Sequence, residues 1–345
     1  MTFILDDYDF QLPKELIASQ PLERRDAAKM MLVDRGLRHF DDAFFSELPN
    51  ILTAGDVVVI NNTRVFPARL FGTIPTGARV EIFLVEENND KTWNALAKPT
   101  RRLRPGKIVD FGSGLSAEVI EKNPDSSITI RFNRAEELFE ILEEIGRTPL
   151  PPYIKRPADV PDRDRERYQT VYAKYRGSIA APTAGLHFTP KVLDALRQNG
   201  IDLIEITLHV GYGTFEPVRV DDIRFHRVKP ERYSLTSVSA ATLNAAKSDQ
   251  RRIIAVGTTT TRALETNLRN FGKFTAISEL ADLTILPGHE FSAVDGLLTN
   301  FHLPKSSLLI LVSAFAGREF IMKAYAHAVQ QGYRFYSYGD CMLIT

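Results

Sequence analysis

Asp56-Val-Val-Val-Ile-Asn-Asn62 is the stretch that decides the fold. Its apolar, β-branched run ends in two asparagines, a pattern typical of a buried strand with a polar carboxyl end, where open α/β sheets bind ligands. Such a strand needs partners, and an alternating helix and strand pattern begins only after Ser178. We therefore predict a discontinuous, mixed-sheet α/β catalytic domain built from residues 1–64 and 150–345.

Residues 65–149 have a different character, that of short alternating segments separated by glycine, proline or asparagine. Six such segments fit a small antiparallel barrel or sandwich, and we expect a β-barrel inserted into the α/β domain. The expected strands are 68–73, 79–86, 93–98, 107–111, 115–121 and 127–132.

The α/β pattern is read from apolar periodicity and from helix start and stop signals. It predicts strands at 30–34, 56–61, 202–210, 252–256, 283–286 and 296–300, and helices at 12–18, 190–199, 240–247, 306–315, 318–331 and from residue 260.

Composition excludes several classes of protein. The 43 basic and 43 acidic side chains cancel, so any nucleic-acid binding must come from local patches. No window holds the roughly 18 uninterrupted apolar residues of a membrane span, and the N-terminus does not resemble a signal peptide. The single cysteine, Cys341, suits a reducing compartment. We expect a cytoplasmic protein that is not associated with a membrane.

Two segments combine histidine with glycine, proline and aromatic residues, as a shaped pocket requires. They are Ala180-Ala-Pro-Thr-Ala-Gly-Leu-His-Phe-Thr189 and Leu208-His-Val-Gly-Tyr-Gly-Thr-Phe-Glu-Pro-Val218. Their histidines, His187 and His209, lack a recognised zinc spacing, so no metal is expected. Glu216 lies among apolar and aromatic neighbours, where desolvation would raise its pKa toward useful values; alternatively it is a solvated edge acid.

Two further strand ends carry polar groups. Arg252-Ile-Ile-Ala-Val-Gly-Thr-Thr-Thr-Thr-Arg-Ala-Leu-Glu265 reads as a strand, a glycine turn and a helix whose free N–H groups would bind a carboxylate or phosphate. The alternative is a plain threonine N-cap. Thr299-Asn-Phe-His-Leu-Pro-Lys305 is either a polar site or a surface turn before a helix.

A basic run lies in the predicted insert. Arg101-Arg-Leu-Arg-Pro-Gly-Lys107 offers Arg101, Arg102, Arg104 and Lys107 to a polyanion. Most charge runs are only solvated surface, but a basic loop on a small β-domain is also a means of holding RNA phosphates.

Eight collinear segments together resemble the S-adenosylmethionine:tRNA ribosyltransferase-isomerase family of queuosine biosynthesis. Four are the stretches 180–188, 209–218, 257–265 and 299–304 quoted above. The others are Tyr8-Asp-Phe-Gln-Leu-Pro-Lys-Glu-Leu-Ile-Ala18, Asn61-Asn-Thr-Arg-Val-Phe-Pro-Ala-Arg-Leu70, Pro149-Leu-Pro-Pro-Tyr-Ile154 and Tyr338-Gly-Asp340.

The resemblance implies transfer and isomerisation of the ribosyl group of S-adenosylmethionine onto 7-aminomethyl-7-deazaguanine at the tRNA wobble position. This gives epoxyqueuosine-tRNA and releases adenine and methionine. S-adenosylmethionine is then a consumed co-substrate, tRNA is the partner, and we expect a monomer.

That reaction needs a base, an acid and donors to oxygen. The catalytic candidates are His187, His209, Glu216 and Asp340, with the acid and base roles left open. For the methionine carboxylate we expect Thr258, Thr259 and Arg262, and for ribose or base edges Asn62, Arg64 and Asn300.

One segment departs from the family pattern His-x-x-His-x-Glu. The chain has His226-Arg-Val-Lys-Pro-Glu231, so Lys229 replaces the second imidazole, and a lysine is a poor neutral base near pH 7. A catalytically silent tRNA-binding relative is therefore the second hypothesis. A methyltransferase is the third, and the missing glycine-rich loop argues against it.

Overall fold

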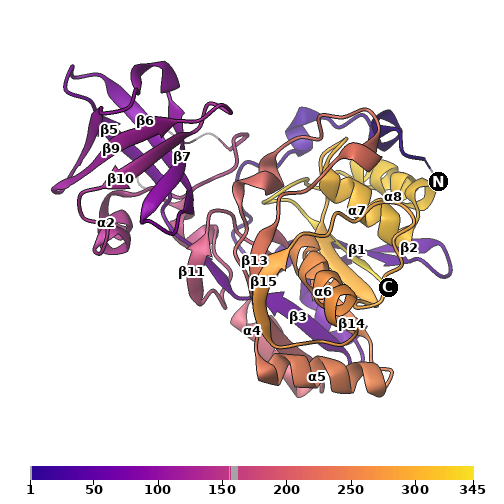
Figure 1. Cartoon of the computed structure of the whole chain (residues 1–345). Helices are drawn as coiled ribbons and strands as arrows, with labels where there is room; N and C mark the ends of the chain where they lie inside the picture. The colour runs from indigo at the N-terminus through magenta and orange to yellow at the C-terminus, as the bar shows by residue number, and fades with distance from the viewer. Residues whose placement is uncertain (1, 155, 157–161) are drawn as a thin grey trace. The chain divides into compact units, whose positions relative to one another are not determined.

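The computed structural model describes residues 2–154, 156 and 162–345 and divides the chain into two compact units (Figure 1). The first unit comprises residues 1–63, 170–175 and 181–345, and the second comprises residues 64–169 and 176–180. The predicted insert, 65–149, lies within the range of the second unit. The mixed α/β class with a small β-barrel is confirmed.

The first unit contains a mixed sheet, nine-stranded in the described part of the chain. In sheet order its strands are β15 (Ile277–Ala281), β13 (Glu231–Leu235), β12 (Asp202–Leu208), β3 (Val57–Asn61), β14 (Ile253–Val256), β16 (Gly296–Asn300), β17 (Cys341–Ile344), β1 (Lys29–Asp34) and β2 (His39–Phe44). All of β3 is buried, as its continuous apolar run requires of a strand covered on both faces.

Helices flank this sheet. They are α1 (Leu48–Ile51), α4 (Pro190–Gln198), α5 (Ser237–Ser248), α6 (Thr258–Phe271), α7 (Ser307–Ala316) and α8 (Arg318–Gln330), with the 3₁₀ turns η2 (Lys14–Leu16), η6 (Thr183–His187), η7 (Tyr212–Phe215) and η8 (Ile223–Phe225) among the connections. Local signals set their starts: Thr189 caps α4, accepting from the Val192 N–H at 3.2 Å, and Pro190 follows at the first helical position.

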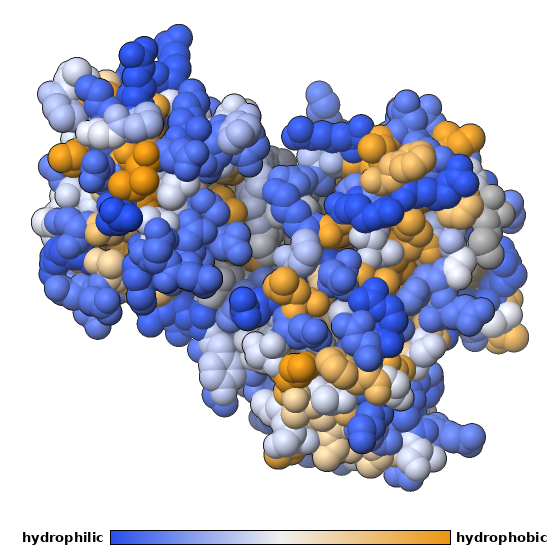
Figure 2. All heavy atoms as spheres, in the orientation of Figure 1, coloured by the Kyte–Doolittle hydropathy of each residue, from blue (hydrophilic) through white to orange (hydrophobic). Residues whose placement is uncertain are grey.

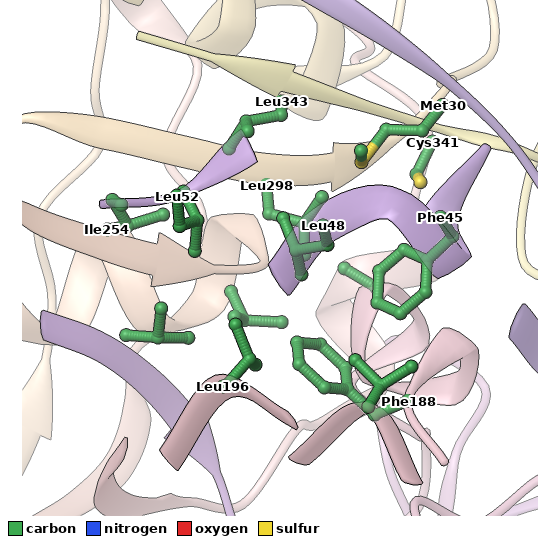
Figure 3. Close-up of a cluster of buried hydrophobic side chains, with 14 of the residues drawn as sticks. Met30, Phe45, Leu48, Leu52, Phe188, Leu196, Ile254, Leu298, Cys341 and Leu343 are labelled. Atoms are coloured by element: carbon green, nitrogen blue, oxygen red, sulfur yellow. The ribbon is translucent and has the colours of Figure 1, made fainter. Parts of the chain in front are cut away.

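A buried apolar cluster joins the sheet to α1 and α4. Leu298 of β16 and Leu343 of β17 pack against Leu48 and Leu196 of these helices (Figure 3). At one end of the cluster the Phe45 ring lies 5.0 Å from Phe188 and 5.2 Å from His187, centroid to centroid. Burial of this cluster therefore fixes the position of η6 and of the imidazole at its end.

The second unit is a closed barrel of β10-β7-β6-β5-β8-β9. The strands are β5 (Arg69–Thr73), β6 (Arg79–Glu87), β7 (Thr92–Lys98), β8 (Ile108–Gly112), β9 (Leu115–Lys122) and β10 (Ile128–Phe132), within two residues of the predicted ranges. The second unit also contains the helices α2 (Leu138–Ile145) and α3 (Asp164–Arg167) and the 3₁₀ turn η5 (Thr100–Arg102). The short strands β4 (Thr63–Val65) and β11 (Tyr175–Ser178) pair with each other.

Two predicted elements were wrong. The expected helix at 12–18 is only the single turn η2, because Phe335 pairs with the chain there: its N–H donates to Leu16 O at 2.7 Å and its carbonyl accepts from Ala18 N at 3.1 Å. The expected strand at 283–286 is not formed. The strand β15 ends at Ala281, two residues before that range, and the Leu283 carbonyl instead accepts from Arg262 Nε at 3.0 Å.

Candidate functional site

Four neighbouring strands of the sheet, β12, β3, β14 and β16, run parallel and end at one edge. The residues at or just beyond these ends are His209, Asn62, Thr258 and Asn300. Strand β17 runs antiparallel to β16, with Cys341 opposite Asn300, so Asp340 enters the sheet at the same edge. Separate candidates in the sequence therefore meet at the edge where α/β sheets bind ligands.

His187 is buried, with 5% of its surface exposed, and is held by Asn300. Asn300 donates from Nδ2 to Tyr336 O at 2.9 Å, which turns its Oδ1 toward His187 Nε2 at 3.1 Å. Burial lowers the pKa of His187 to about 4, although the bonds with Asn300 and with the Arg25 backbone act in the opposite direction. The imidazole is therefore neutral near pH 7.

Asp340 ties three chain segments together. Its Oδ1 accepts from the Lys29 N–H at 2.9 Å, and its Oδ2 accepts from the Arg334 N–H at 2.8 Å. Burial raises the pKa of this carboxyl, while these backbone hydrogen bonds oppose the rise. Both oxygens thus have structural partners at the start of β17.

His209 follows β12 and is only partly buried. Its Nδ1 lies 2.8 Å from Thr63 Oγ1. Burial, and then the positive charge of Arg232, lower the pKa of His209. Beside it, Asn62 donates to Glu205 Oε2 at 2.8 Å and accepts from Thr207 Oγ1 at 2.7 Å, which makes a polar row across the ends of β3 and β12.

The two histidines lie at different strand ends. His209 follows β12 and His187 meets β16, with β3 and β14 between them. Three strand spacings of about 4.8 Å separate these ends by about 14 Å. A proton-transfer group must come within about 3 Å of the atom it serves. The two rings therefore lie near strand ends that are not neighbours in the sheet.

Glu216 lies in the loop that follows His209 and is paired with Lys229. The Lys229 Nζ is 2.9 Å from Glu216 Oε1, with the two side chains 61% and 35% exposed. A methyl group on Gly213 would lie 3.0 Å from Lys229 Cβ, so the lysine stem also packs on this loop. The residue that departs from the family pattern thus touches the His209 loop twice.

Arg262 and Glu231 form a buried ion pair, Nη1 to Oε2 at 2.7 Å, with each side chain 4% exposed. Arg262 also donates hydrogen bonds to three carbonyls, those of Leu283, Lys229 and Ala281. Four of its five N–H groups are therefore engaged. Glu231 Oε1 accepts from the Gly211 N–H at 3.0 Å.

Sequence reasoning gave Glu231 no role. Its signal was its place as the last residue of the segment that departs from the family pattern.

A pocket lies at the N-terminus of α6. Gly257, at φ +92°, makes the turn from β14 into this helix. Thr258, Thr259, Arg262 and His226 line the pocket with Thr284 and Ser307, and its apolar lining is Val228, Ile285, Leu286, Leu308, Ile310 and Leu311. Among the described residues, His226 Nε2 has no hydrogen-bond partner. Burial lowers the pKa of His226, and the nearby Arg227 adds to this.

Five other candidates belong to the second unit. Arg64 is exposed, and so are Arg101, Arg102, Arg104 and Lys107 between β7 and β8. In this run only Leu103 is buried, where it anchors the loop to the barrel.

Across residues 2–154, 156 and 162–345, no group of three or more His, Cys, Asp or Glu side chains is placed to hold a metal ion. In the same residues, no helix has the length and apolar character to cross a membrane.

Comparison with known proteins gives a consistent result. The model of the family described as queuosine biosynthesis protein matches residues 5–344. The chain is 49% identical to the S-adenosylmethionine:tRNA ribosyltransferase-isomerase of Syntrophotalea carbinolica and 46% identical to that of Desulforamulus reducens, over 99% of both chains in each case. It is also similar to the crystal structure of S-adenosylmethionine tRNA ribosyltransferase from Thermotoga maritima, with 33% identity, a TM-score of 0.56, and 98% of this chain and 100% of that one covered.

Proposed function

This chain belongs to the queuosine biosynthesis protein family, and on that premise we propose that it is an S-adenosylmethionine:tRNA ribosyltransferase-isomerase. It transfers and isomerises the ribosyl group of S-adenosylmethionine onto 7-aminomethyl-7-deazaguanine at the tRNA wobble position, and adenine and methionine leave. The observation that carries the proposal is the single sheet edge that gathers His209, Asn62, Thr258, Asn300 and Asp340.

His209 is the proposed base. It takes the proton from the carbon next to the sulfonium, which the positive sulfur acidifies. Its partial burial and lowered pKa keep the ring neutral near pH 7, as a base requires. Glu216, in the same loop, is the second proposed proton-transfer group, and Lys229 sits at its carboxylate.

His187 and Asp340 act by position in this proposal. Both are buried and both are bonded to other chain segments. His187 holds η6 to Asn300 at the end of β16, and Asp340 holds the start of β17 to the backbone of Lys29 and Arg334. A buried neutral imidazole and a carboxylate with two backbone donors shape the site without taking a proton from substrate.

The co-substrate is proposed to bind along the rest of the edge. Thr258 and Thr259 offer first-turn N–H groups and hydroxyls to the methionine carboxylate, and Arg262, whose charge is paired with Glu231, lines the same pocket. The apolar side of the pocket suits the methionine methylenes. Asn62 and Asn300 are proposed for ribose or base edges, and Arg64, which belongs to the second unit, stays a prediction from the sequence.

The units divide the work in the same proposal. The first unit, which contains most of the predicted α/β domain (residues 1–64 and 150–345), carries catalysis. The second unit, which contains the predicted insert (residues 65–149), offers Arg101, Arg102, Arg104 and Lys107 to tRNA phosphates. The same proposal has the protein act in the cytoplasm as a monomer, with tRNA as its partner and S-adenosylmethionine as a consumed co-substrate.

Product analysis tests the function. The protein is mixed with S-adenosylmethionine and tRNA bearing the aminomethyl base, and adenine, methionine and S-adenosylhomocysteine are measured by mass spectrometry. We expect adenine and methionine. Bound tRNA without adenine would support a silent binding relative, and S-adenosylhomocysteine would indicate a methyltransferase.

The His209→Ala variant tests the proposed base. Because one positioned proton-transfer group contributes about 10²–10⁴-fold, we expect turnover to fall by that factor. His39→Ala is the matched control, since His39 is exposed on β2 and its Nε2 lies 3.0 Å from Asp41 Oδ2. Equal activity of the two variants would remove His209 from the proton-transfer step.

A further inference from the structure

Thr63 is held rigidly at the end of β3. It is fully buried, and its N–H donates to Asn61 Oδ1 at 3.1 Å. The same Asn61 side chain exchanges two hydrogen bonds with Leu208, donating to its carbonyl and accepting from its N–H, each at 2.9 Å. Asn61 thereby fastens Thr63 to the last residue of β12, directly before His209.

The Thr63 hydroxyl has two neighbours. His209 Nδ1 lies 2.8 Å from Oγ1, and the Tyr175 carbonyl oxygen lies 3.4 Å from it. A carbonyl oxygen only accepts, whereas a hydroxyl carries one hydrogen and two lone pairs. If Thr63 gives its hydrogen to Tyr175, its lone pair faces His209, and the hydrogen of that contact must come from Nδ1.

We propose that Thr63 is a positioning residue that fixes His209 as the Nδ1–H tautomer and so leaves Nε2 with a free lone pair. The proposal rests on the proposed role of His209 as the base. It assigns to Thr63 the function that a carboxylate has behind many catalytic histidines, because the partner of one ring nitrogen decides the state of the other. In the reverse tautomer Nε2 carries the hydrogen, and a protonated Nε2 cannot accept a proton from the substrate.

The geometry favours this direction for a second reason. When Nδ1–H donates to Oγ1 and Oγ1–H donates to Tyr175 O, both contacts of the Thr63 hydroxyl are hydrogen bonds. With Thr63 donating to Nδ1 instead, the hydroxyl no longer serves the Tyr175 carbonyl. The contact to Tyr175 is long, so the gain comes from completing the relay of hydrogen bonds and not from that bond alone.

Nitrogen-15 NMR of the full-length protein labelled at histidine tests the tautomer directly. The His209 ring signals are assigned by their loss in His209→Gln. We expect protonated Nδ1 and unprotonated Nε2 in the wild type and in Thr63→Ser, which keeps the hydroxyl. Valine has nearly the same shape as threonine but no hydroxyl. In Thr63→Val we therefore expect the His209 ring to shift toward the tautomer protonated at Nε2.

Turnover gives the second measurement. Thr63→Val should lower kcat by at least about 10-fold with little change in KM, and Thr63→Ser should keep most of the activity. If His209 in the wild type is protonated at Nε2, the inference is overturned. The wild-type nitrogen-15 spectrum alone gives this result, even if Thr63→Val does not fold. The predicted tautomers together with a fully active His209→Ala would leave the inference standing and overturn the proposed base.

Discussion

At the scale of single residues, the buried neutral His187 makes stability depend on pH. Its pKa falls from 6.5 to about 4 on folding because of burial. The unfolded chain therefore takes up a proton at a pH where the folded chain does not, so stability is lost as the pH falls from about 6.5 to about 4. We expect this side chain to cost about 2 kcal/mol of unfolding free energy between pH 7 and pH 5.

Urea unfolding of the wild type and of His187→Gln at pH 7 and pH 5 measures this effect. The gap between the two proteins should narrow by about 2 kcal/mol at pH 5, because the variant has no imidazole to protonate. His302 serves as the reference for a second buried ring, with a pKa lowered to about 3 by burial, and it remains in both proteins. A gap that is the same at both pH values contradicts the assignment.

Residue identity indicated which polar residues stand at the ends of strands but not which of their atoms meet. Asn62, His209 and Asn300 could be placed from sequence because each stands where an apolar run ends. The bond from Thr63 to His209 could not be predicted, since it joins residues 146 positions apart and depends on the order of strands in the sheet. The expected desolvation of Glu216 did not anticipate Lys229, whose ammonium lies at that carboxylate.

At the scale of elements, the pair of Arg262 and Glu231 joins α6 to β13 and to the turn after β12. Removing one partner leaves the other charge buried without compensation, which costs about 3–5 kcal/mol. We therefore expect Arg262→Met to lower the unfolding free energy by about that amount in urea titrations. The double variant Arg262→Met with Glu231→Gln should lose less, because no net charge stays buried.

Arg269 on the same helix is the matched control. It pairs with Asp282, but the two side chains are 44% and 57% exposed. Exposed pairs contribute about 0–1 kcal/mol, so Arg269→Met should be nearly neutral. If Arg262→Met were as mild as Arg269→Met, the buried pair would have no special structural role.

Elements were predictable where local signals agreed with packing. The barrel strands and α4 have the apolar periodicity of their type and are bounded by turn or capping residues, and their observed bounds are close to the expected ones. The exceptions depend on distant partners. At η2, Leu16 and the following Ala18 pair with the backbone of Phe335. The strand β15 lies at 277–281 because it pairs with β13, and the β13 sequence Glu-Arg-Tyr-Ser-Leu gave no clear strand signal.

At the scale of the whole molecule, the 43 basic and 43 acidic side chains cancel, so the proposed contact with tRNA depends on a local basic patch. The viewed face of each unit is mainly hydrophilic with scattered apolar residues (Figure 2), so hydropathy does not mark one surface for binding. The sequence could predict the inserted barrel because β3 needs partners from the later half of the chain. It could not predict which basic residues bind RNA, because solvated and phosphate-binding arginines look alike in sequence.

Salt dependence separates these two kinds of arginine. Each phosphate contact adds about 0.7–0.9 to the slope of log affinity against log salt, so the triple change of Arg101, Arg102 and Arg104 to alanine should reduce that slope by about 2–3. The control changes Arg79, Lys122 and Arg131, which are exposed on the same barrel and carry the same total charge. Filter binding of tRNA at several salt concentrations measures both variants. If the two triple variants have equal slopes of log affinity against log salt, the phosphate contacts lie outside the loop between β7 and β8. If the slope is reduced in the first variant alone, that loop binds the tRNA phosphates.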